Sequence, residues 1–203
     1  FFEMMIEQLA RTFRIQPEVI GCDTHPGYLA SKYAHRLVSG SVDIPGIDPS
    51  RLTLIEIQHH HAQVASCMAE HGLTGERPII GVAFDGTGYG TDGAIWGGEF
   101  LVMDYESFRR AAHLKYVPLP GGDAAIRRPY RIGLAYLWAA GVDWDVDLPT
   151  VATASPEERT ILMQQLERGV NTVSTSSSGR LFDAVASLAG VRQVINYEAQ
   201  AAI

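Results

Sequence analysis

The chain has few cysteines, and their placement indicates the compartment in which it works. Its 203 residues hold only Cys22 and Cys67, which lie far apart and form no CxxC pair. The sequence also lacks the pattern of a secretory signal peptide. Both absences favour a protein of the reducing cytoplasm over a disulfide-stabilised secreted protein.

Basic residues and long apolar runs are also scarce. The chain has 16 Lys and Arg residues against 23 Asp and Glu residues, a formal net charge of −7. An acidic chain without a basic stripe is not expected to bind nucleic acid. No apolar run approaches the roughly 20 residues that a membrane-spanning helix needs, so we expect no membrane association. Hydrophobic residues make up 46 %, enough for the core of one large domain or two small ones.

The two ends of the sequence do not resemble natural termini. The first residues, FFEMMIEQLA, begin inside an amphipathic pattern and without a methionine, and the last, NYEAQAAI, resemble the start of a helix. We therefore expect both ends to be cuts through a larger protein.

The first third of the chain alternates between helical and strand patterns. Apolar residues at helical spacing predict a helix over residues 2–13, followed by a strand over 18–23. A second helix is expected within residues 25–37, with Pro26 in its first turn. The apolar, β-branched residues 52–58 predict another strand, and a helix follows the three histidines. This alternation indicates a parallel α/β layer.

The remainder of the chain separates into a strand-rich and a helical part. Residues 79–84, 94–104 and 108–119 read as consecutive antiparallel strands. Helical patterns dominate from residue 121 onward, with a long connection over 139–156 and a polar loop over 174–179. The fold class that follows is α/β with a helical region after residue 120.

The segment IIGVAFDGTGYGTDG, residues 79–93, carries the strongest chemical pattern. An apolar strand runs into Asp85 and then into a turn rich in glycine. Glycines let backbone N–H groups approach an anion, Thr87 adds a hydroxyl, and a carboxylate at a strand end can hold a metal ion. An ordinary glycine-rich hairpin turn is the alternative, and the spacing alone does not decide between them.

Three consecutive histidines, His59 to His61, follow the strand over 52–58. Metal ligands on a helix need i, i+4 spacing, because only then do two side chains share a face. No HxxxH occurs in the chain; Gln63 stands four residues after His59, and its amide oxygen is a poor transition-metal ligand. Taken alone, the run is better explained as a polar helix start than as a metal site.

Three further segments carry weaker signals. The Ser/Gly loop before the helix of residues 180–190 favours an anion, and Asp183 could accept hydrogen bonds from a ribose, although a helix-dipole role explains it better. Asp123 is interpreted as a helix N-cap, and Asp23 beside His25 as the cap of the next helix. Three arginines near Asp123 could contact phosphate or simply face solvent: Arg127, Arg128 and Arg131.

Each of these motifs is a weak signal by itself, but their order along the chain points to a known family. DTHPGYLASKYA, QHHHAQVASCMAEHGL, IIGVAFDGTGYGTDGAIWGGEF, HLKYVPLPGGDAAIRRPYRIGLAYL and TSSSGRLFDAVASLAGV together resemble the C-terminal catalytic module of the HypF carbamoyltransferases, maturation factors of [NiFe]-hydrogenases. The resemblance runs from about residue 2 to residue 203. The same module is similar to the O-carbamoyltransferases of antibiotic biosynthesis. More distantly, it resembles the threonylcarbamoyl transferases of tRNA modification.

The resemblance implies a fold and a reaction. The fold is the actin/hexokinase-like one of two ribonuclease-H-like halves, here incomplete. Residues 1–120 would hold the first half and the start of the second, and residues 121–203 an incomplete helical nucleotide-binding part. The reaction transfers a carbamoyl group from carbamoyl-adenylate, made from carbamoyl phosphate and ATP elsewhere in the parent enzyme, to the C-terminal cysteine of a HypE-like partner.

The resemblance also implies a metal and a nucleotide site. A divalent metal, iron or zinc, would be held by His59 and Asp85, with Gln63 at the position of a second family histidine. The nucleotide-binding residues it implies are Gly86, Thr87, Gly88, Gly179, Asp183 and Gln200. In YEAQAA, Ala199 replaces a glycine of the family's YEGQAA.

Two other interpretations stay open. An O-carbamoyltransferase that acts on a small molecule shares the same module. A non-catalytic nucleotide-binding or docking domain, in which the metal site has decayed, is favoured by Gln63 and Ala199. A tRNA-modifying role fits least, because the phosphate turn reads DGTGYG and the chain is acidic.

Overall fold

A computed structural model describes all 203 residues, which form two compact units, Phe1–Ala62 and Gln63–Ile203. The boundary falls inside helix α3 (His59–Glu70). The division at residue 120 that the resemblance implies stays a prediction. None of the helices has both the length and the apolar character needed to cross a lipid bilayer.

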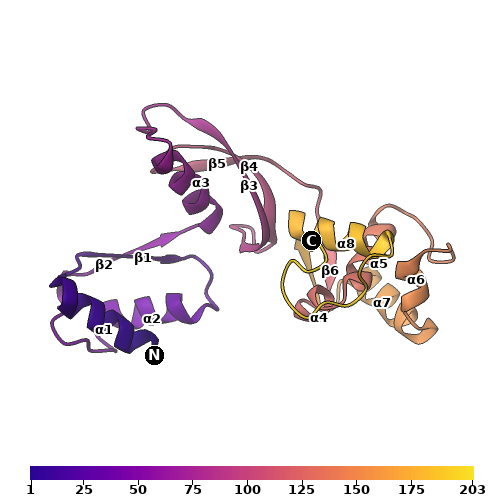
Figure 1. Ribbon diagram of the computed structural model, residues 1–203, viewed down its shortest axis with the longest axis horizontal. Helices are drawn as coiled ribbons and strands as arrows, with labels where there is room; N and C mark the ends of the chain where they lie inside the picture. Colours follow the sequence, from indigo (N-terminus) through magenta and orange to yellow (C-terminus); the bar gives the residue numbers. More distant parts are fainter. The chain divides into compact units, whose positions relative to one another are not determined.

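The first unit places helices on a two-stranded parallel sheet (Figure 1). Its elements are α1 (Phe2–Phe13), β1 (Val19–Asp23), α2 (Leu29–Val38), a 3-10 turn η1 (Pro49–Arg51) and β2 (Thr53–Ile57). Strands β1 and β2 are parallel, with Val19 opposite Thr53 and Asp23 opposite Ile57, which confirms the predicted parallel layer. Parallel strands need a crossover between them, and α2 provides it.

The core of the first unit lies between α2 and the segment that leads from α2 to β2. It is built from the buried side chains of Tyr33, Leu37, Ile44, Ile47 and Leu52. The helix predicted over residues 2–13 is confirmed, and it ends because Arg14 adopts a left-handed conformation with φ of 51°. The prediction that Pro26 lies in the first turn of α2 is wrong, since α2 begins only at Leu29 after a separate turn.

The second unit contains a five-stranded sheet. Its strands are β3 (Ile79–Tyr89), β4 (Ile95–Met103), β5 (Phe108–His113), β6 (Val117–Pro120) and β7 (Thr172–Thr175). The order is β3-β4-β7-β6, with β5 also paired to β4. The strands β3, β4 and β5 are consecutive and antiparallel, as predicted.

The predicted strand over residues 108–119 is two strands with different partners. β5 pairs with β4, whereas β6 pairs with β7, a strand that the sequence patterns did not reveal. Strand β7 is only four residues long, and it lies in a segment of Ser and Thr without an apolar alternation. Because it pairs with both β4 and β6, β7 brings Thr175 into the middle of the sheet.

Five helices complete the second unit, and Figure 1 shows them gathered near β6. They are α4 (Asp123–Ile126), α5 (Pro129–Ala139), α6 (Pro149–Thr153), α7 (Pro156–Arg168) and α8 (Ser178–Leu188). Helix α5 is buried nearly all round, because its apolar side chains contact both the sheet and the other helices. The helical region predicted after residue 120 is thus confirmed, with β7 inserted in it.

Candidate functional site

The glycine-rich turn forms an irregularity in strand β3. Phe84 pairs with Gly98 and Gly88 pairs with Trp96, so residues 85–87 bulge out opposite Gly97. A side chain on Gly97 would collide with the Asp85 carbonyl group, so only glycine fits there. Bulges of this kind redirect side chains at functional sites, and this one displays Asp85.

The Asp85 carboxylate organises the turn around it. Its Oδ1 accepts a hydrogen bond of 2.6 Å from the Gly86 N–H and a longer one of 3.5 Å from Thr87. Its Oδ2 accepts from the Gln63 side-chain amide at 2.9 Å. The predicted residues Gln63, Asp85, Gly86 and Thr87 are therefore neighbours in the second unit, and Gln63 meets Asp85 as a hydrogen-bond donor.

The loop between β7 and α8 packs directly on this turn. Ser177, fully buried, donates from Oγ to the carbonyl oxygens of Asp85 and Gly86, each at 2.8 Å. The same hydroxyl caps α8 by accepting from the Arg180 N–H. A Cβ on Gly179 would lie 2.7 Å from the Gly86 Cα, so the two backbones touch. Two segments more than 90 residues apart thus form one surface.

Asp183 lies inside the second unit with a single charged partner. It is 1 % exposed, and its Oδ2 lies 2.8 Å from Arg180 Nε, one turn earlier on α8. The pair lacks hydrogen-bond geometry, and both carboxylate oxygens have no regular hydrogen-bond donor. Burial raises the pKa of Asp183, although Arg180 opposes the rise. Arg180 also reaches toward Gly86, so this unsatisfied pair adjoins the turn.

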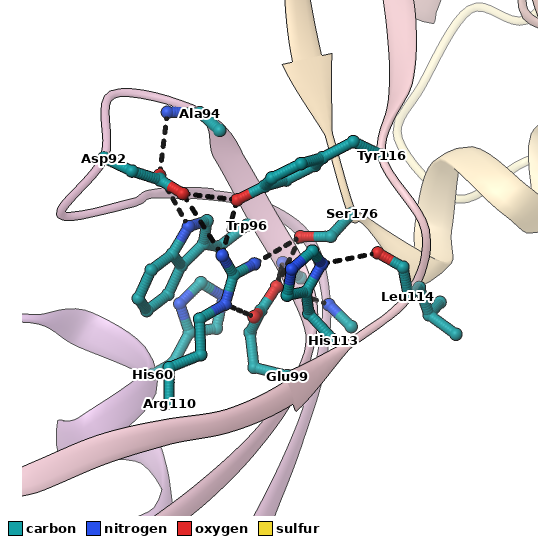
Figure 2. A network of polar contacts seen from close by, with 12 residues as sticks. His60, Asp92, Ala94, Trp96, Glu99, Arg110, His113, Leu114, Tyr116 and Ser176 are labelled. Atoms are coloured by element: carbon teal, nitrogen blue, oxygen red, sulfur yellow. Dashed lines mark hydrogen bonds and ion pairs between the residues drawn. The ribbon is translucent and has the colours of Figure 1, made fainter.

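A second buried carboxylate, Glu99 on β4, is hydrogen-bonded to Arg110 and to Ser176 (Figure 2). Its Oε1 accepts from the N–H groups of Gly97 and Gly98 at 3.1 and 3.2 Å. It also accepts from the Ser176 hydroxyl, the residue next to Ser177. Its Oε2 accepts from Arg110 Nε at 2.5 Å. Glu99 therefore connects the part of β4 that lies opposite the β3 bulge to the loop that leads into α8.

The guanidinium of Arg110 connects Glu99 to an outer carboxylate. Figure 2 shows it hydrogen-bonded to Asp92 and Tyr116, and its Cζ lies 4.0 Å from the centre of the Trp96 ring. Burial acts to raise the pKa of Glu99, but hydrogen bonds from Arg110 and three other donors outweigh it and lower that pKa. The hydrogen bonds of this network therefore favour the ionised form of Glu99.

The segment YEAQAA lies in a turn at the end of the chain. Gln200 accepts from the Asn196 N–H at 2.8 Å, and the Glu198 carboxylate lies beside Gly86. Ala199 has φ of +62°, a left-handed conformation that glycine adopts freely and alanine does not. Ala199, at a position where the resemblance implies a glycine, therefore lies where the backbone prefers glycine.

The histidine run divides between different roles. His59 Nδ1 lies 3.1 Å from the Asp23 carboxylate within the first unit. The His60 side chain is buried, and its Nδ1 contacts Gln58 at 2.8 Å. His59 belongs to the first unit and Asp85 to the second, so their joint metal role stays a prediction.

Three of the weaker interpretations need correction. Asp23 accepts from the His25 N–H at 2.7 Å and so closes a turn, while the N-cap of α2 is Tyr28. The N-cap of α4 is Gly122, one residue before Asp123. Arg131 is paired with Glu158 at 2.6 Å, which makes it part of the α5–α7 packing.

Sequence reasoning missed the residues that brace the site: Asp92, Glu99, Arg110, Tyr116 and Arg180. Several of their partners are remote in the sequence: Glu99 and Ser176 are 77 positions apart, and Asp92 and Tyr116 are 24 apart. The one local signal was a charged residue, Glu99, in the otherwise apolar strand AIWGGEFLVMD. A charge is stable there only if it is paired, so it could have indicated a buried network.

The fold and these motifs agree with comparisons to known proteins. Residues 81–203 match the family model described as the second subdomain of the carbamoyltransferase Kae1-like domain, and residues 1–70 match the HypF Kae1-like domain. The chain belongs to the carbamoyltransferase HypF family. The recognition made from the motif order is thereby confirmed.

Individual relatives match along the whole chain. The carbamoyltransferase HypF of Rhizobium leguminosarum bv. viciae is 39 % identical over 203 residues, which are all of this chain and 24 % of that protein. A HypF homolog from Cupriavidus necator is 36 % identical over 99 % of this chain and 48 % of its own length. The chain thus spans about a quarter to a half of these relatives.

Solved structures confirm the α/β fold of the family. A crystal structure of full-length HypF in its phosphate- and nucleotide-bound form matches with a TM-score of 0.82 and 45 % identity, over 98 % of this chain and 24 % of that one. The HypF of T. kodakarensis matches with a TM-score of 0.80 and 35 % identity, over 99 % of this chain and 26 % of that one.

Proposed function

We propose that this chain forms part of a carbamoyltransferase of hydrogenase maturation, in which the turn at Asp85 receives carbamoyl-adenylate. The acceptor is the C-terminal cysteine of a HypE-like partner. The bond between the carbamoyl carbon and the phosphate oxygen breaks, and a C–S bond forms. AMP leaves, and the thiol gives up its proton. The proposal rests on the names of the relatives and on the site geometry, and it assumes a cytoplasmic enzyme.

The observation that carries the nucleotide part is the unsatisfied pair of Arg180 and Asp183 beside the glycine turn. Buried polar groups without hydrogen bonds are costly, and they persist where a ligand completes them. A ribose hydroxyl can donate to Asp183, and Arg180 can meet an anionic phosphate. Because Gly86 and Gly179 have no Cβ atoms, the two backbone segments touch beside this pair. Thr87, Gly88 and Gln200 complete the proposed nucleotide set.

A divalent metal, iron or zinc, held by His59 and Asp85 is part of the proposal through the resemblance alone. Imidazole and carboxylate are suitable ligands for either ion. Gln63 does not fit, because it presents an amide N–H₂ group to Asp85. We therefore assign the chain's own residues to binding the nucleotide and route no step through the metal.

Binding of AMP, the stable part of the donor, tests the nucleotide site. Calorimetric titration of the 203-residue chain is expected to show one site, weakened at least tenfold in Asp183→Asn. Asp104→Asn is the matched control, because Asp104 closes the remote β4–β5 hairpin by accepting from the N–H groups of Glu106 and Ser107. Equal binding by both variants contradicts the nucleotide assignment.

The acceptor is tested separately by mass spectrometry. Supplied carbamoyl-adenylate should add one carbamoyl group to the C-terminal cysteine of a HypE-like protein. Modification of a small-molecule hydroxyl instead would favour the O-carbamoyltransferase alternative. AMP binding without any transfer, even in the full-length protein, would favour the non-catalytic nucleotide-binding or docking domain.

Gln63→His tests the metal part. Restoring the i, i+4 pair with His59 should raise the affinity for Fe²⁺ or Zn²⁺ at least tenfold, because imidazole replaces a hydrogen-bond donor. Gln63→Asn serves as the control, since it alters the Asp85 contact without supplying an imidazole. No gain over this control would remove the basis for a metal at Asp85.

A further inference from the structure

The first unit contains a cluster of metal-ligating side chains that the proposed function does not use. Cys22 on β1, His35 on α2 and Glu56 on β2 each offer one ligand atom, and these three atoms lie within 4.8 Å of one another. His35 Nε2 and Glu56 Oε1 are 3.1 Å apart. Cys22 is half-buried, and the other two side chains are about half exposed. Thiol, imidazole and carboxylate are the three ligand types that zinc combines in proteins.

The fold fixes this cluster through strand register. Cys22 pairs with Glu56 in the parallel β1–β2 ladder, so the two side chains leave the sheet on the same face. Ile20, two residues before Cys22, packs in the core with α2, which shows that this face is the one α2 covers. A register shift of one residue would place Gly21 or Asp23 at this point, and the thiol would turn away.

We propose that Cys22, His35 and Glu56 form a binding site for Zn²⁺ or a chemically similar divalent ion, with water as the fourth ligand. Bonds of about 2.0–2.3 Å at tetrahedral angles place ligand atoms roughly 3.3–3.8 Å apart. The cluster reaches this geometry by small rotations of two exposed side chains. The site is distinct from the one at Asp85, because its ligands all belong to the first unit.

The charge around the sulfur supports a cation here. Burial raises the pKa of the Cys22 thiol most, the carboxylates of Glu56 and Asp23 raise it further, and a hydrogen bond with Ser31 offsets part of the rise. A cation would offset both carboxylates. Asp23 is not counted as a ligand, because it follows Cys22 on the opposite face of β1 and contacts His59.

Cobalt titration tests the site, since Co²⁺ bound to a thiolate gives an ultraviolet charge-transfer band. The 203-residue chain should show this band at one equivalent of Co²⁺, and Zn²⁺ should abolish it. Cys22→Ser should lose the band. His35→Gln and Glu56→Gln should each weaken Co²⁺ binding at least tenfold. Because the band requires sulfur, Co²⁺ bound by His59 or Asp85 does not produce it.

Cys67→Ser is the matched control. Cys67 Sγ on α3 lies 3.7 Å from Nδ1 of His71, the residue that follows this helix, so it offers a cysteine–histidine pair without the carboxylate. The band should persist in this variant. A band that survives in Cys22→Ser, disappears in Cys67→Ser or is unchanged by Glu56→Gln overturns the proposal, as does the absence of any band in the unmodified chain. If Cys22→Ser fails to fold, the two variants at half-exposed positions still decide it.

Discussion

Two buried carboxylates in the second unit, Glu99 and Asp183, differ in how they are stabilised. Each is almost fully buried, and each lies against an arginine, Arg110 or Arg180. Glu99 accepts hydrogen bonds from four donors and its pKa is lowered, whereas Asp183 has only its ion pair and its pKa is raised. The number of hydrogen-bond donors, more than the presence of an arginine, therefore determines which carboxylate is stabilised in its ionised form.

This difference matches the positions of the two residues. Glu99 is hydrogen-bonded to Gly97, Gly98 and Ser176, which lie next to the turn at Asp85. Because every member of this network has a partner, the network keeps the backbone there rigid. Asp183 lies beneath the surface where we propose that a nucleotide binds. Its oxygens lack a hydrogen bond of regular geometry, which leaves hydrogen-bonding capacity for a ligand.

Glu99→Gln should disrupt the hydrogen-bonded network around Glu99 and cause the largest loss of stability. The amide keeps the shape but removes the charge that compensates Arg110, and its N–H₂ group faces donors. We expect the free energy of unfolding to fall by about 3–5 kcal/mol, the usual range for breaking a buried ion pair. Urea denaturation measures it. Asp92→Asn, at the exposed end of the same network, is the control and should cost about 1 kcal/mol or less; equal losses would mean that Glu99 has no special role.

Asp183→Asn should cost less stability than Glu99→Gln. Asp183 loses one ion pair without hydrogen-bond geometry, and the amide also escapes the penalty of a buried charge. We expect a loss of about 1–3 kcal/mol in the same urea experiment, the range for a buried group left without its partner. A loss as large as that of Glu99→Gln would show that Arg180 compensates Asp183 fully.

The pH dependence of stability should have opposite signs at the two carboxylates. The pKa of Glu99 is lowered from 4.5, so its stabilisation is complete above pH 4.5 and is lost as the pH falls through the folded-state pKa. The pKa of Asp183 is raised from 3.8, so its contribution is present below pH 3.8 and is lost as the pH rises through the folded-state pKa. Each shift is worth about 1.4 kcal/mol per pKa unit.

Unfolding free energies between pH 3 and 7 measure this, as differences between the unmodified chain and each amide variant. The Glu99→Gln difference should grow with increasing pH, and the Asp183→Asn difference should shrink. Two differences that change in the same direction would refute the distinction between the two environments.

The comparison also shows what the sequence could and could not predict. Asp85, Gly86 and Gly179 were singled out because a strand end, a glycine turn and a helix start have local patterns, and the structure brings them into contact. Glu99 was missed because its side-chain donors, Arg110 and Ser176, come from β5 and from the loop after β7. Strand β7 was missed as well, since its four residues lack an alternation of apolar and polar side chains. Pairings between remote segments leave little local trace.

The smallest expected effect concerns the end of the chain, where Glu198 approaches the same turn that Arg180 reaches. Ala199→Gly should stabilise the second unit by about 1 kcal/mol, because φ of +62° is strained for alanine and relaxed for glycine. Ala189→Gly is the control: its φ of −75° is ordinary, so glycine there should destabilise by about 0.5–1 kcal/mol. Thermal unfolding measures both variants. Stabilisation confined to Ala199→Gly would show that backbone strain alone favours glycine at this position. A loss in both would show that the left-handed turn is not held in solution.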